Sequence, residues 1–403
     1  MLRLLPLVLG AFAIGAETFM VSGVLPQISS DLHVTTAAAG SLVTIFALAY
    51  AFGSPLIAVA TAGVERKRLL IFAIGAFALA NLLAAVAPSF EALAAARALL
   101  ALTAGSFMPA AVAFAAALFT AEHRGRAIAT IYGGMTAATV VGVPAGVYLA
   151  SLASWRAPFF GVAVLAALAA VGVATLLPSQ PGVRAAGFGE RIAVARRPAV
   201  LQMLTLTTLA LIGPFAINTF FGVLAEQALG IGGDKLALVL AFFGIVSFAG
   251  SQFGGFAADH WPRERFLLIV FIVLIAAFPL MSLGPMLGGV AGAALLFIGL
   301  GFWGLFGWAF PIVQQARLVS LDPAMAPITL SLNISALYIG VAIGASLGAG
   351  VIARWSLDAL GLVAGASEIL ALAWLLLTGA RKPADEATQC PSAGDAPRFA
   401  AGE

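Results

Sequence analysis

The chain has 403 residues, of which 62% are apolar and only 9% are charged, and its formal net charge is +3. Soluble domains carry about 25% charged residues, so this composition cannot cover a water-facing surface. Disordered chains are poor in apolar residues, and a disulfide-stabilised secreted scaffold needs more than the single cysteine present here. The small net charge does not indicate a nucleic-acid partner. A polytopic membrane protein remains, in agreement with the mean hydropathy of +1.08.

Twelve apolar runs are long enough to cross a bilayer as helices. Their continuous apolar character excludes spanning β-strands, which alternate over about ten residues. The first run contains Glu17 and ends near Asp31 without a small-residue cleavage site, so we do not interpret it as a cleaved signal peptide. The predicted spans are 5–28, 38–61, 68–87, 91–118, 127–151, 157–177, 200–225, 236–257, 266–284, 287–313, 325–352 and 358–379.

Lysine and arginine residues fall almost entirely on one side of a twelve-span arrangement. Sixteen lie on the side of the termini, three (Arg156, Lys235 and Arg354) lie on the other, and Arg97 lies inside a span. Because basic loops are retained in the cytoplasm, both termini are predicted to be cytoplasmic.

A polar segment rich in proline, glycine and arginine divides the spans into two groups of six. We therefore predict an N-terminal six-helix bundle at 1–177, a cytoplasmic linker at 178–199, a C-terminal six-helix bundle at 200–380 and a disordered cytoplasmic tail at 381–403. A short basic loop follows the second span of each half, and two repeated six-span bundles are a known transporter architecture. The charges alone would fit any cytoplasmic loop equally well.

Two motifs resemble those of the major facilitator superfamily, specifically its twelve-span drug:proton antiporters of the chloramphenicol-resistance and arabinose-efflux type. The span-1 motif runs from Gly15 to Leu32, although Thr18 here separates Glu17 from the Phe that directly follows the glutamate in close relatives. The basic loop after span 2 lacks the usual glycine and aspartate in its N-terminal copy. The residues that match are Arg66, Lys67 and Arg68 in the N-terminal copy, and Gly255, Asp259, Arg263 and Arg265 in the C-terminal copy.

Two further motifs lie inside spans. Arg97 stands in span 4, where the family places an arginine that is linked to proton coupling. Span 5 carries Gly142, Pro144 and Gly146, which resemble the motif that is typical of exporters. The resemblance implies an all-α membrane protein with twelve transmembrane helices in two six-helix bundles, acting as a monomer without cofactors in a bacterial inner membrane.

Glu17 and Arg97 are the candidate proton-coupling residues. A charge at the bilayer centre costs about 2.5–3.5 kcal/mol on insertion scales, and such residues commonly mark ion or substrate paths. A neutral, structural Glu17 and a purely structural Arg97 are the alternatives. Arg97 keeps its charge at every relevant pH, so it cannot itself carry the proton. For Glu368 in span 12, we favour a structural role, because that span packs on the outside of its bundle in this superfamily.

In the superfamily, spans 1, 4, 7 and 10 line the substrate cavity. Aromatic side chains with a few amides suit an amphipathic organic ligand, although lipid-facing aromatics are an alternative for some of them. The candidate cavity residues are Phe19, Met20, Phe215, Asn218, Phe221, Trp303, Phe306 and Gln314.

The sequence thus favours a proton-coupled exporter of small amphipathic molecules such as drugs, with a sugar or metabolite efflux permease of the same fold as the alternative. A channel or an intramembrane enzyme is disfavoured. The sequence contains no Walker A motif, no His-Glu-x-x-His and no Cys/His cluster. The string Gly344-Ala345-Ser346-Leu347-Gly348 lies inside span 11 rather than at a strand-to-helix turn, so it indicates helix packing.

The single cysteine provides a test of orientation. Cys390 lies in the predicted cytoplasmic tail, so a membrane-impermeant thiol reagent should not label it in intact, right-side-out cells. Permeabilised cells serve as the control and should be labelled. Rapid labelling of intact cells would overturn the predicted topology.

Overall fold

The computed structural model describes residues 4–182, 187–230 and 233–379, so the predicted tail at 381–403, with Cys390, lies outside the described residues. The regular elements in these ranges are all helices. Twelve helical stretches are long and apolar enough to cross a membrane. The predicted fold class, an all-α membrane protein with twelve transmembrane helices, is confirmed.

The helices follow the predicted spans closely. The N-terminal half contains α1 (Leu5–Asp31), α2 (Thr36–Ala60), α3 (Arg66–Ala85), α4 (Phe90–Leu118), α5 (Ala121–Ala137), η2 (Ala138–Gly142), α6 (Val143–Leu152) and α7 (Ala157–Leu176). The C-terminal half contains α9 (Pro198–Leu229), α10 (Gly233–His260), α11 (Arg263–Leu287), α12 (Gly289–Phe302), η3 (Trp303–Gly307), α13 (Trp308–Leu321), η4 (Pro323–Met325), α14 (Ala326–Arg354) and α15 (Ala359–Gly379).

The linker predicted at 178–199 contains a short helix that its polar composition did not indicate. This helix, α8 (Phe188–Ala195), buries Val194. Its Arg191 Nη1 donates a 2.8 Å hydrogen bond to Ser331 on α14. Partial burial lowers the pKa of the Arg191 guanidinium from its usual value. This helix therefore attaches the second part of the linker to the C-terminal half, whereas Gln180 at its start accepts a 3.0 Å hydrogen bond from the backbone N–H of Arg66 in the N-terminal half.

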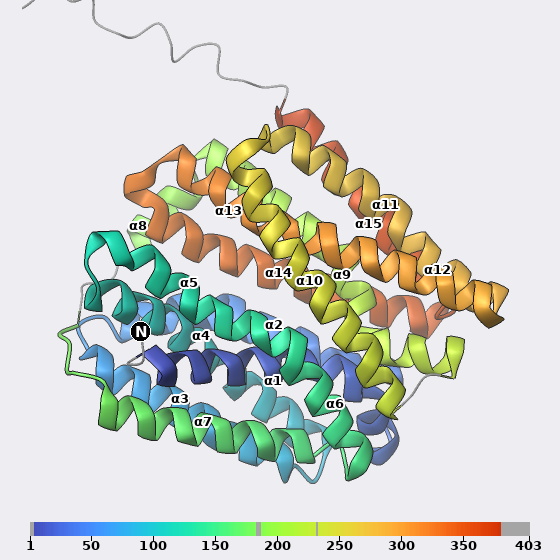
Figure 1. The fold of residues 1–403 in the computed structure, drawn as a ribbon, viewed down its shortest axis with the longest axis horizontal. Coiled ribbons are helices and arrows are strands. Elements are labelled where there is room, and N and C mark those ends of the chain that lie inside the picture. The colour runs from blue at the N-terminus through green and yellow to red at the C-terminus, as the bar shows by residue number, and fades with distance from the viewer. Residues whose placement is uncertain (1–3, 183–186, 231–232, 380–403) are drawn as a thin grey trace, which may run out of the picture.

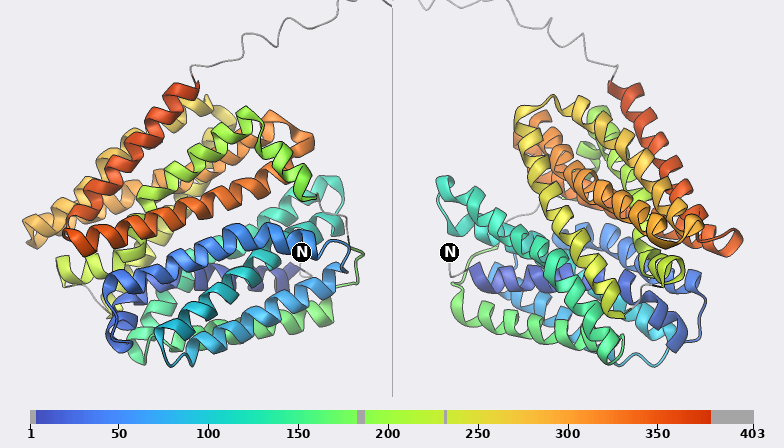
Figure 2. Two further views of the ribbon diagram at one scale, coloured as in Figure 1. Left: turned by 180° about the vertical axis from the view of Figure 1, so that it is seen from behind. Right: turned by 45° about the vertical axis from the view of Figure 1, so that its right-hand side comes forward.

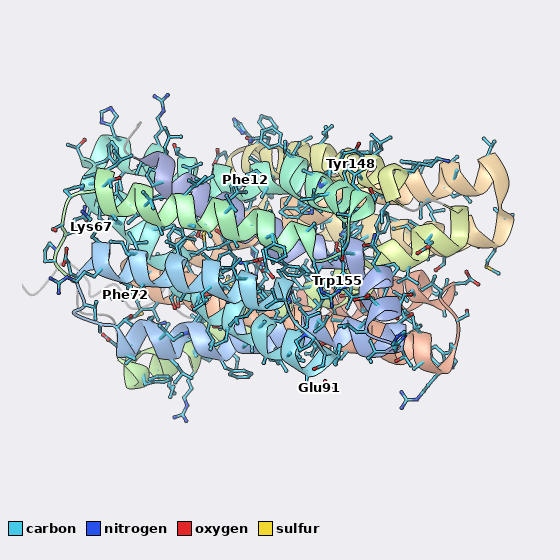
Figure 3. All side chains as sticks on the ribbon, turned by 90° about the horizontal axis from the view of Figure 1, so that it is seen from below. Phe12, Lys67, Phe72, Glu91, Tyr148 and Trp155 are labelled. Carbon is cyan, nitrogen blue, oxygen red and sulfur yellow. The ribbon has the colours of Figure 1, made fainter. Side chains whose placement is uncertain are left out.

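The two halves lie against each other, the blue-to-green half below and the yellow-to-red half above in Figure 1, and Figure 2 shows the same division from two other sides. Helix α2 packs against α14, α6 packs against α10, and α1 packs against α9. Apolar side chains such as Phe72 on α3, which is 73% exposed, point outward (Figure 3). Such a surface suits a lipid environment rather than water.

Contacts between the halves extend from the middle of the spans toward the end that carries the α1–α2 connection. Thr44 and Ser346 share a hydrogen bond of 3.2 Å, and the rings of Tyr50 and Tyr338 stack with centroids 4.0 Å apart. A Cβ placed on Gly40 would overlap the ring of Phe220. Lys67 lies at the opposite end of the molecule, away from Glu91 and Trp155 (Figure 3). The halves are therefore joined at the end that the charge pattern predicts to be periplasmic.

Spans 5 and 10 each contain a π-helical turn, η2 and η3. Pro144 follows η2 closely, and because proline lacks an N–H group it cannot make the regular helical hydrogen bond. The glycines of this segment face α1. A Cβ on Gly142 would lie 2.9 Å from the Cβ of Ala16, and one on Gly146 would lie 3.3 Å from the sulfur of Met20. The exporter-like motif thus packs directly beside Glu17.

Glycine also sets the closest approach within the C-terminal half. A Cβ on Gly344 of α14 would lie 2.4 Å from the carbonyl oxygen of Ile212 on α9. Small residues at such positions allow backbones to meet, which drives helix association in lipid.

Substitution of Gly344 by alanine should separate α14 from α9. We expect the free energy of unfolding in detergent micelles to fall by about 1–3 kcal/mol, as is typical of overpacking. Gly75→Ala in α3 is the matched control, because nothing lies within 4 Å of a Cβ added there. Equal unfolding midpoints for the two variants would contradict the close contact.

Candidate functional site

Glu17 and Arg97 form a buried ion pair at the centre of the N-terminal half. Arg97 Nη1 on α4 donates to Glu17 Oε1 on α1, and the two side chains are 1% and 0% exposed. Each charge would be costly alone in an apolar interior, and the pairing offsets part of that cost. The structure therefore brings the two candidate proton-coupling residues into direct contact.

Several polar atoms of the pair have no hydrogen-bond partner among the described residues. Glu17 Oε2 and Arg97 Nε and Nη2 make no hydrogen bond to the described residues. The Arg97 guanidinium instead lies over the ring of Phe46 on α2, with its central carbon 4.3 Å from the ring centroid. A cation is attracted to the face of an aromatic ring. The site thus keeps free hydrogen-bonding capacity for a proton, a water molecule or a ligand.

A small cavity adjoins the pair and is lined by both halves. Its volume is about 40 Å³. Thr18, Phe19 and Arg97 contribute from the N-terminal half, and Phe215, Leu337 and Tyr338 contribute from the C-terminal half. Pockets for drug-sized ligands measure about 300–1,000 Å³, so this cavity is far too small for one. An organic molecule can enter only if the two halves move apart.

Of the eight predicted cavity residues, two line the central cavity and the others pack elsewhere in this conformation. Phe19 and Phe215 line the central cavity, and the ring centroid of Phe19 lies 5.7 Å from that of Trp308 on α13. Asn218 is half-buried on α9. Met20 lies against Gly146, and Phe221 is 2% exposed.

The remaining three pack within the C-terminal half. The ring of Trp303 lies 4.4 Å from Phe243, and that of Phe306 lies 5.9 Å from Phe253 (centroid distances). Gln314 is fully buried and donates hydrogen bonds to the Met203 carbonyl at 2.8 Å and to Thr207 at 3.2 Å. In this conformation the structure does not bring these three residues to the central cavity.

Sequence reasoning missed the aromatic residues that α2 and α14 bring to the site. Tyr338 stacks on Tyr50, and the ring centroids of Tyr338 and Phe46 lie 6.2 Å apart. The chain has only four tyrosines, and all of them lie inside predicted spans, so Tyr50 and Tyr338 were an available signal. These contacts connect Phe46, the ring over which Arg97 lies, to the C-terminal half.

The basic loops act as helix-to-helix ties. Arg66 Nη1 donates to the carbonyl of Ala113 near the end of α4 at 2.7 Å, and Arg263 Nη1 donates to that of Ala316 on α13 at 3.2 Å. Cations are favourable near helix C-termini, where carbonyl groups lack partners. The two arginines occupy matching places in the two halves, which supports the internal repeat.

The other motif residues are more exposed. Arg68 pairs with Glu65 at 2.8 Å, and Lys67 is partly exposed. Among the ion pairs of the described residues none involves Asp259 or Arg265, both of which are exposed, and Gly255 has open space around it. Asp259 is therefore not held to a neighbouring helix by an ion pair among the described residues in this conformation.

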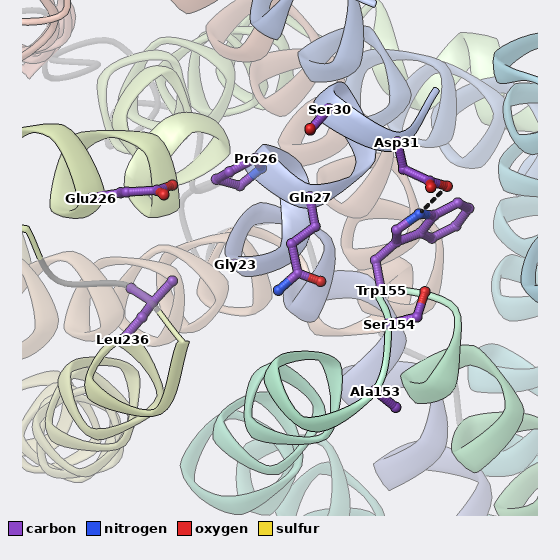
Figure 4. Close-up of a pocket in the computed structure, with 10 residues that line it drawn as sticks. All are labelled: Gly23, Pro26, Gln27, Ser30, Asp31, Ala153, Ser154, Trp155, Glu226 and Leu236. Atoms are coloured by element: carbon purple, nitrogen blue, oxygen red, sulfur yellow. Dashed lines mark hydrogen bonds between the residues drawn. The ribbon is translucent and has the colours of Figure 1, made fainter. Parts of the chain in front are cut away.

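Asp31, near the end of the span-1 motif, belongs to a polar cluster at the end of the molecule opposite the basic loops. This cluster connects α1 to the loops before α7 and after α3. Asp31 accepts a 2.9 Å hydrogen bond from Trp155 Nε1 (Figure 4) and pairs with Arg156. Arg156 also donates to the carbonyl of Ala87 at 3.2 Å. Beside this cluster lies a cavity of about 440 Å³ that is lined by both halves, including Gln27 and Glu226. This polar vestibule lies at the end where the halves meet.

Twelve spanning helices in two halves around a central cavity are the architecture of many secondary transporters. Residues 7–327 match the family described as the Major Facilitator Superfamily, and the chain belongs to it. The resemblance that the sequence motifs indicated is confirmed at this level.

Individual relatives support the assignment. The chain is 36% identical over 287 residues to a chloramphenicol resistance protein of Streptomyces lividans, covering 70% of this chain and 71% of the relative. It is 29% identical over 352 residues to the inner membrane transport protein YdhP of Escherichia coli K12, covering 87% and 88%. A crystal structure of a peptide transporter shares the fold, with a TM-score of 0.78 at 12% identity and 94% coverage of both chains.

Removal of either residue of the buried pair should destabilise the protein, but by different amounts. Glu17→Leu leaves Arg97 charged and unpaired, so the free energy of unfolding in micelles should fall by about 3–5 kcal/mol. Arg97→Leu should cost less, because the remaining glutamate can take up a proton and become neutral. The double variant should recover most of the loss. Simple addition of the two single losses would show that the residues do not interact.

Proposed function

We propose that the protein is a proton-coupled antiporter that exports small amphipathic organic molecules by alternating access. The observation that carries this proposal is the Glu17–Arg97 pair, which is buried beside a cavity lined by both halves. Similarity to an inner membrane transport protein of Escherichia coli supports a bacterial inner membrane as its location. We further propose that it acts as a monomer and, from the asymmetry of its basic residues, that both termini are cytoplasmic.

Protonation of Glu17 would change the electrostatics of the whole site. The ionised carboxylate neutralises Arg97, whereas the protonated acid leaves the guanidinium charge without a counter-charge in an apolar interior. An uncompensated buried charge is strongly unfavourable, so helices or ligands near Arg97 must rearrange. Proton binding is thereby linked to the arrangement of α1, α2 and α4 around the cavity.

The contact between Arg97 and Phe46 gives this rearrangement a route to the other half. Phe46 and Tyr50 contact Tyr338 on α14. A shift of the guanidinium would therefore disturb the α2–α14 interface, where the halves meet. Alternate closing of the halves at the two ends would expose the cavity to one side of the membrane at a time, and an inward proton gradient would drive the cycle toward export.

The lining of the central cavity supports an amphipathic substrate. Phe19, Phe215 and Tyr338 present aromatic surface, Arg97 is the charged residue of the lining, and Glu17 lies behind it as its ion-pair partner. Binding sites for drug-like molecules combine apolar walls with few polar anchors. Similarity to a chloramphenicol resistance protein supports neutral, antibiotic-like substrates. A phosphorylated metabolite would require several Arg or Lys side chains, and a sugar would require more amides and carboxylates than line the cavity.

Coupling is tested with Glu17→Gln, which removes the titratable group and keeps the size of the side chain. Uphill efflux from proteoliposomes driven by an imposed pH gradient should fall to the level of empty vesicles, while substrate still binds. Glu91→Gln is the matched control, because Glu91 is an exposed glutamate at the start of α4. Full uphill transport by Glu17→Gln would remove this residue from the coupling mechanism.

A substrate panel in the same vesicles separates the alternatives. Export of chloramphenicol-like or hydrophobic cationic compounds that collapses with the pH gradient supports the proposal. Export of a sugar or organic anion alone would defeat the substrate class and leave the transporter assignment intact. Flux that is indifferent to the gradient would instead indicate a channel.

A further inference from the structure

Glu368 is a second fully buried acid, and the mechanism above does not use it. It lies on α15, is 0% exposed, and neither of its carboxyl oxygens has a hydrogen-bond partner among the described residues. Buried polar side chains normally have such partners, so an unsatisfied carboxyl group calls for an explanation.

The carboxyl group lies against the backbone of α9 at Gly213. A Cβ placed on Gly213 would lie 2.8 Å from Glu368 Oε1, 2.7 Å from Ser367 Oγ and 2.7 Å from the Ala364 carbonyl oxygen. Only a residue without a side chain allows α15 to approach α9 this closely. The contact therefore depends on this glycine.

The residue that follows Gly213 weakens the backbone hydrogen bonding of α9 at this position. Pro214 lies inside the helix and has no N–H group, so it cannot donate to the carbonyl of Ala210, and helices bend at such positions. Phe215 follows immediately and lines the central cavity. Glu368 therefore contacts α9 at Gly213, only two residues along the backbone from Phe215 in the cavity wall.

No basic side chain of the described residues forms an ion pair with Glu368. The helices packed against α15 are α9, α11 and α14. Their charged and titratable groups are Glu226 on α9, Arg263, Glu264 and Arg265 on α11, and Tyr338 and Arg354 on α14. No ion pair of the described residues includes Glu368, and Glu226 lies 13 residues from Gly213, roughly 20 Å along the helix. A carboxylate without donors or counter-charge is disfavoured, whereas the neutral acid is tolerated.

We propose that Glu368 is a second proton-binding site, located in the C-terminal half, whose neutral acid form holds α15 against α9 at Gly213–Pro214. Loss of the proton to water would break the O–H bond and leave a carboxylate that the closed contact cannot accommodate. Ionisation therefore requires α15 and α9 to separate, and this movement shifts Phe215. The site is distinct from Glu17 and needs no substrate to bind its proton.

Infrared spectroscopy of the protein in lipid nanodiscs tests the proton site, because a protonated carboxylic acid has its own carbonyl stretch. In a Glu17→Gln background this band should persist at neutral pH and disappear on further substitution by Glu368→Gln. No substrate or gradient is used, so failure of the export proposal would not affect the outcome. An unchanged spectrum after Glu368→Gln would overturn the inference.

Amide hydrogen exchange of α9 tests the coupling. After correction for intrinsic exchange, the backbone amides around Gly213 should become less protected over the same pH range in which the infrared band of the protonated acid disappears. Glu368→Gln should remove this pH dependence. Ser367→Ala is the control and should keep it. Gly213→Ala adds a Cβ against the carboxyl group and should shift loss of the band to lower pH. Identical pH dependence in Glu368→Gln and the unsubstituted protein would overturn the coupling.

Discussion

The cost of placing charge inside a bilayer organises this protein. Arg97 cannot lose its charge, so the apolar interior of the N-terminal half must supply compensation, and Glu17 supplies it from α1. The pair brings α1 and α4 together, Phe46 covers the guanidinium from α2, and the cavity beside them reaches α9 and α14. A single proton on Glu17 would upset this balance, which is why we propose that the pair couples proton binding to the arrangement of the helices.

Close helix packing determines where that disturbance can spread. Gly142 and Gly146 let the span-5 segment approach α1 on either side of Glu17, and Gly344 brings α14 onto the backbone of α9. Contacts without intervening side chains transmit displacement from one helix to the next, because packed interiors have little free volume. The π-helical turn η2 and the backbone hydrogen bond that Pro214 cannot make then mark the positions where a helix can bend.

The two halves repeat the same construction with different polar groups. Arg66 and Arg263 tie matching helix ends, and each half buries one acid in a span, Glu17 in the first and Glu368 in the last. Only the first acid has a cationic partner among the described ion pairs. From this asymmetry we propose that the charged site lies in the N-terminal half and that the C-terminal half responds through the contact of α15 with α9.

The sequence by itself determined the fold class, the number of spans and their approximate bounds. A bilayer requires about 20 apolar residues per helix and internal backbone hydrogen bonding, so these features follow from local composition. Only the tertiary structure decided which side chains meet. Glu17 and Arg97 are 80 residues apart, and Tyr338 reaches the site from a span that was not expected to line it. Gln314 and Trp303 point into their own half instead. Helices that are apolar on every face carry no pattern that reveals their orientation, so neighbouring helices determine it.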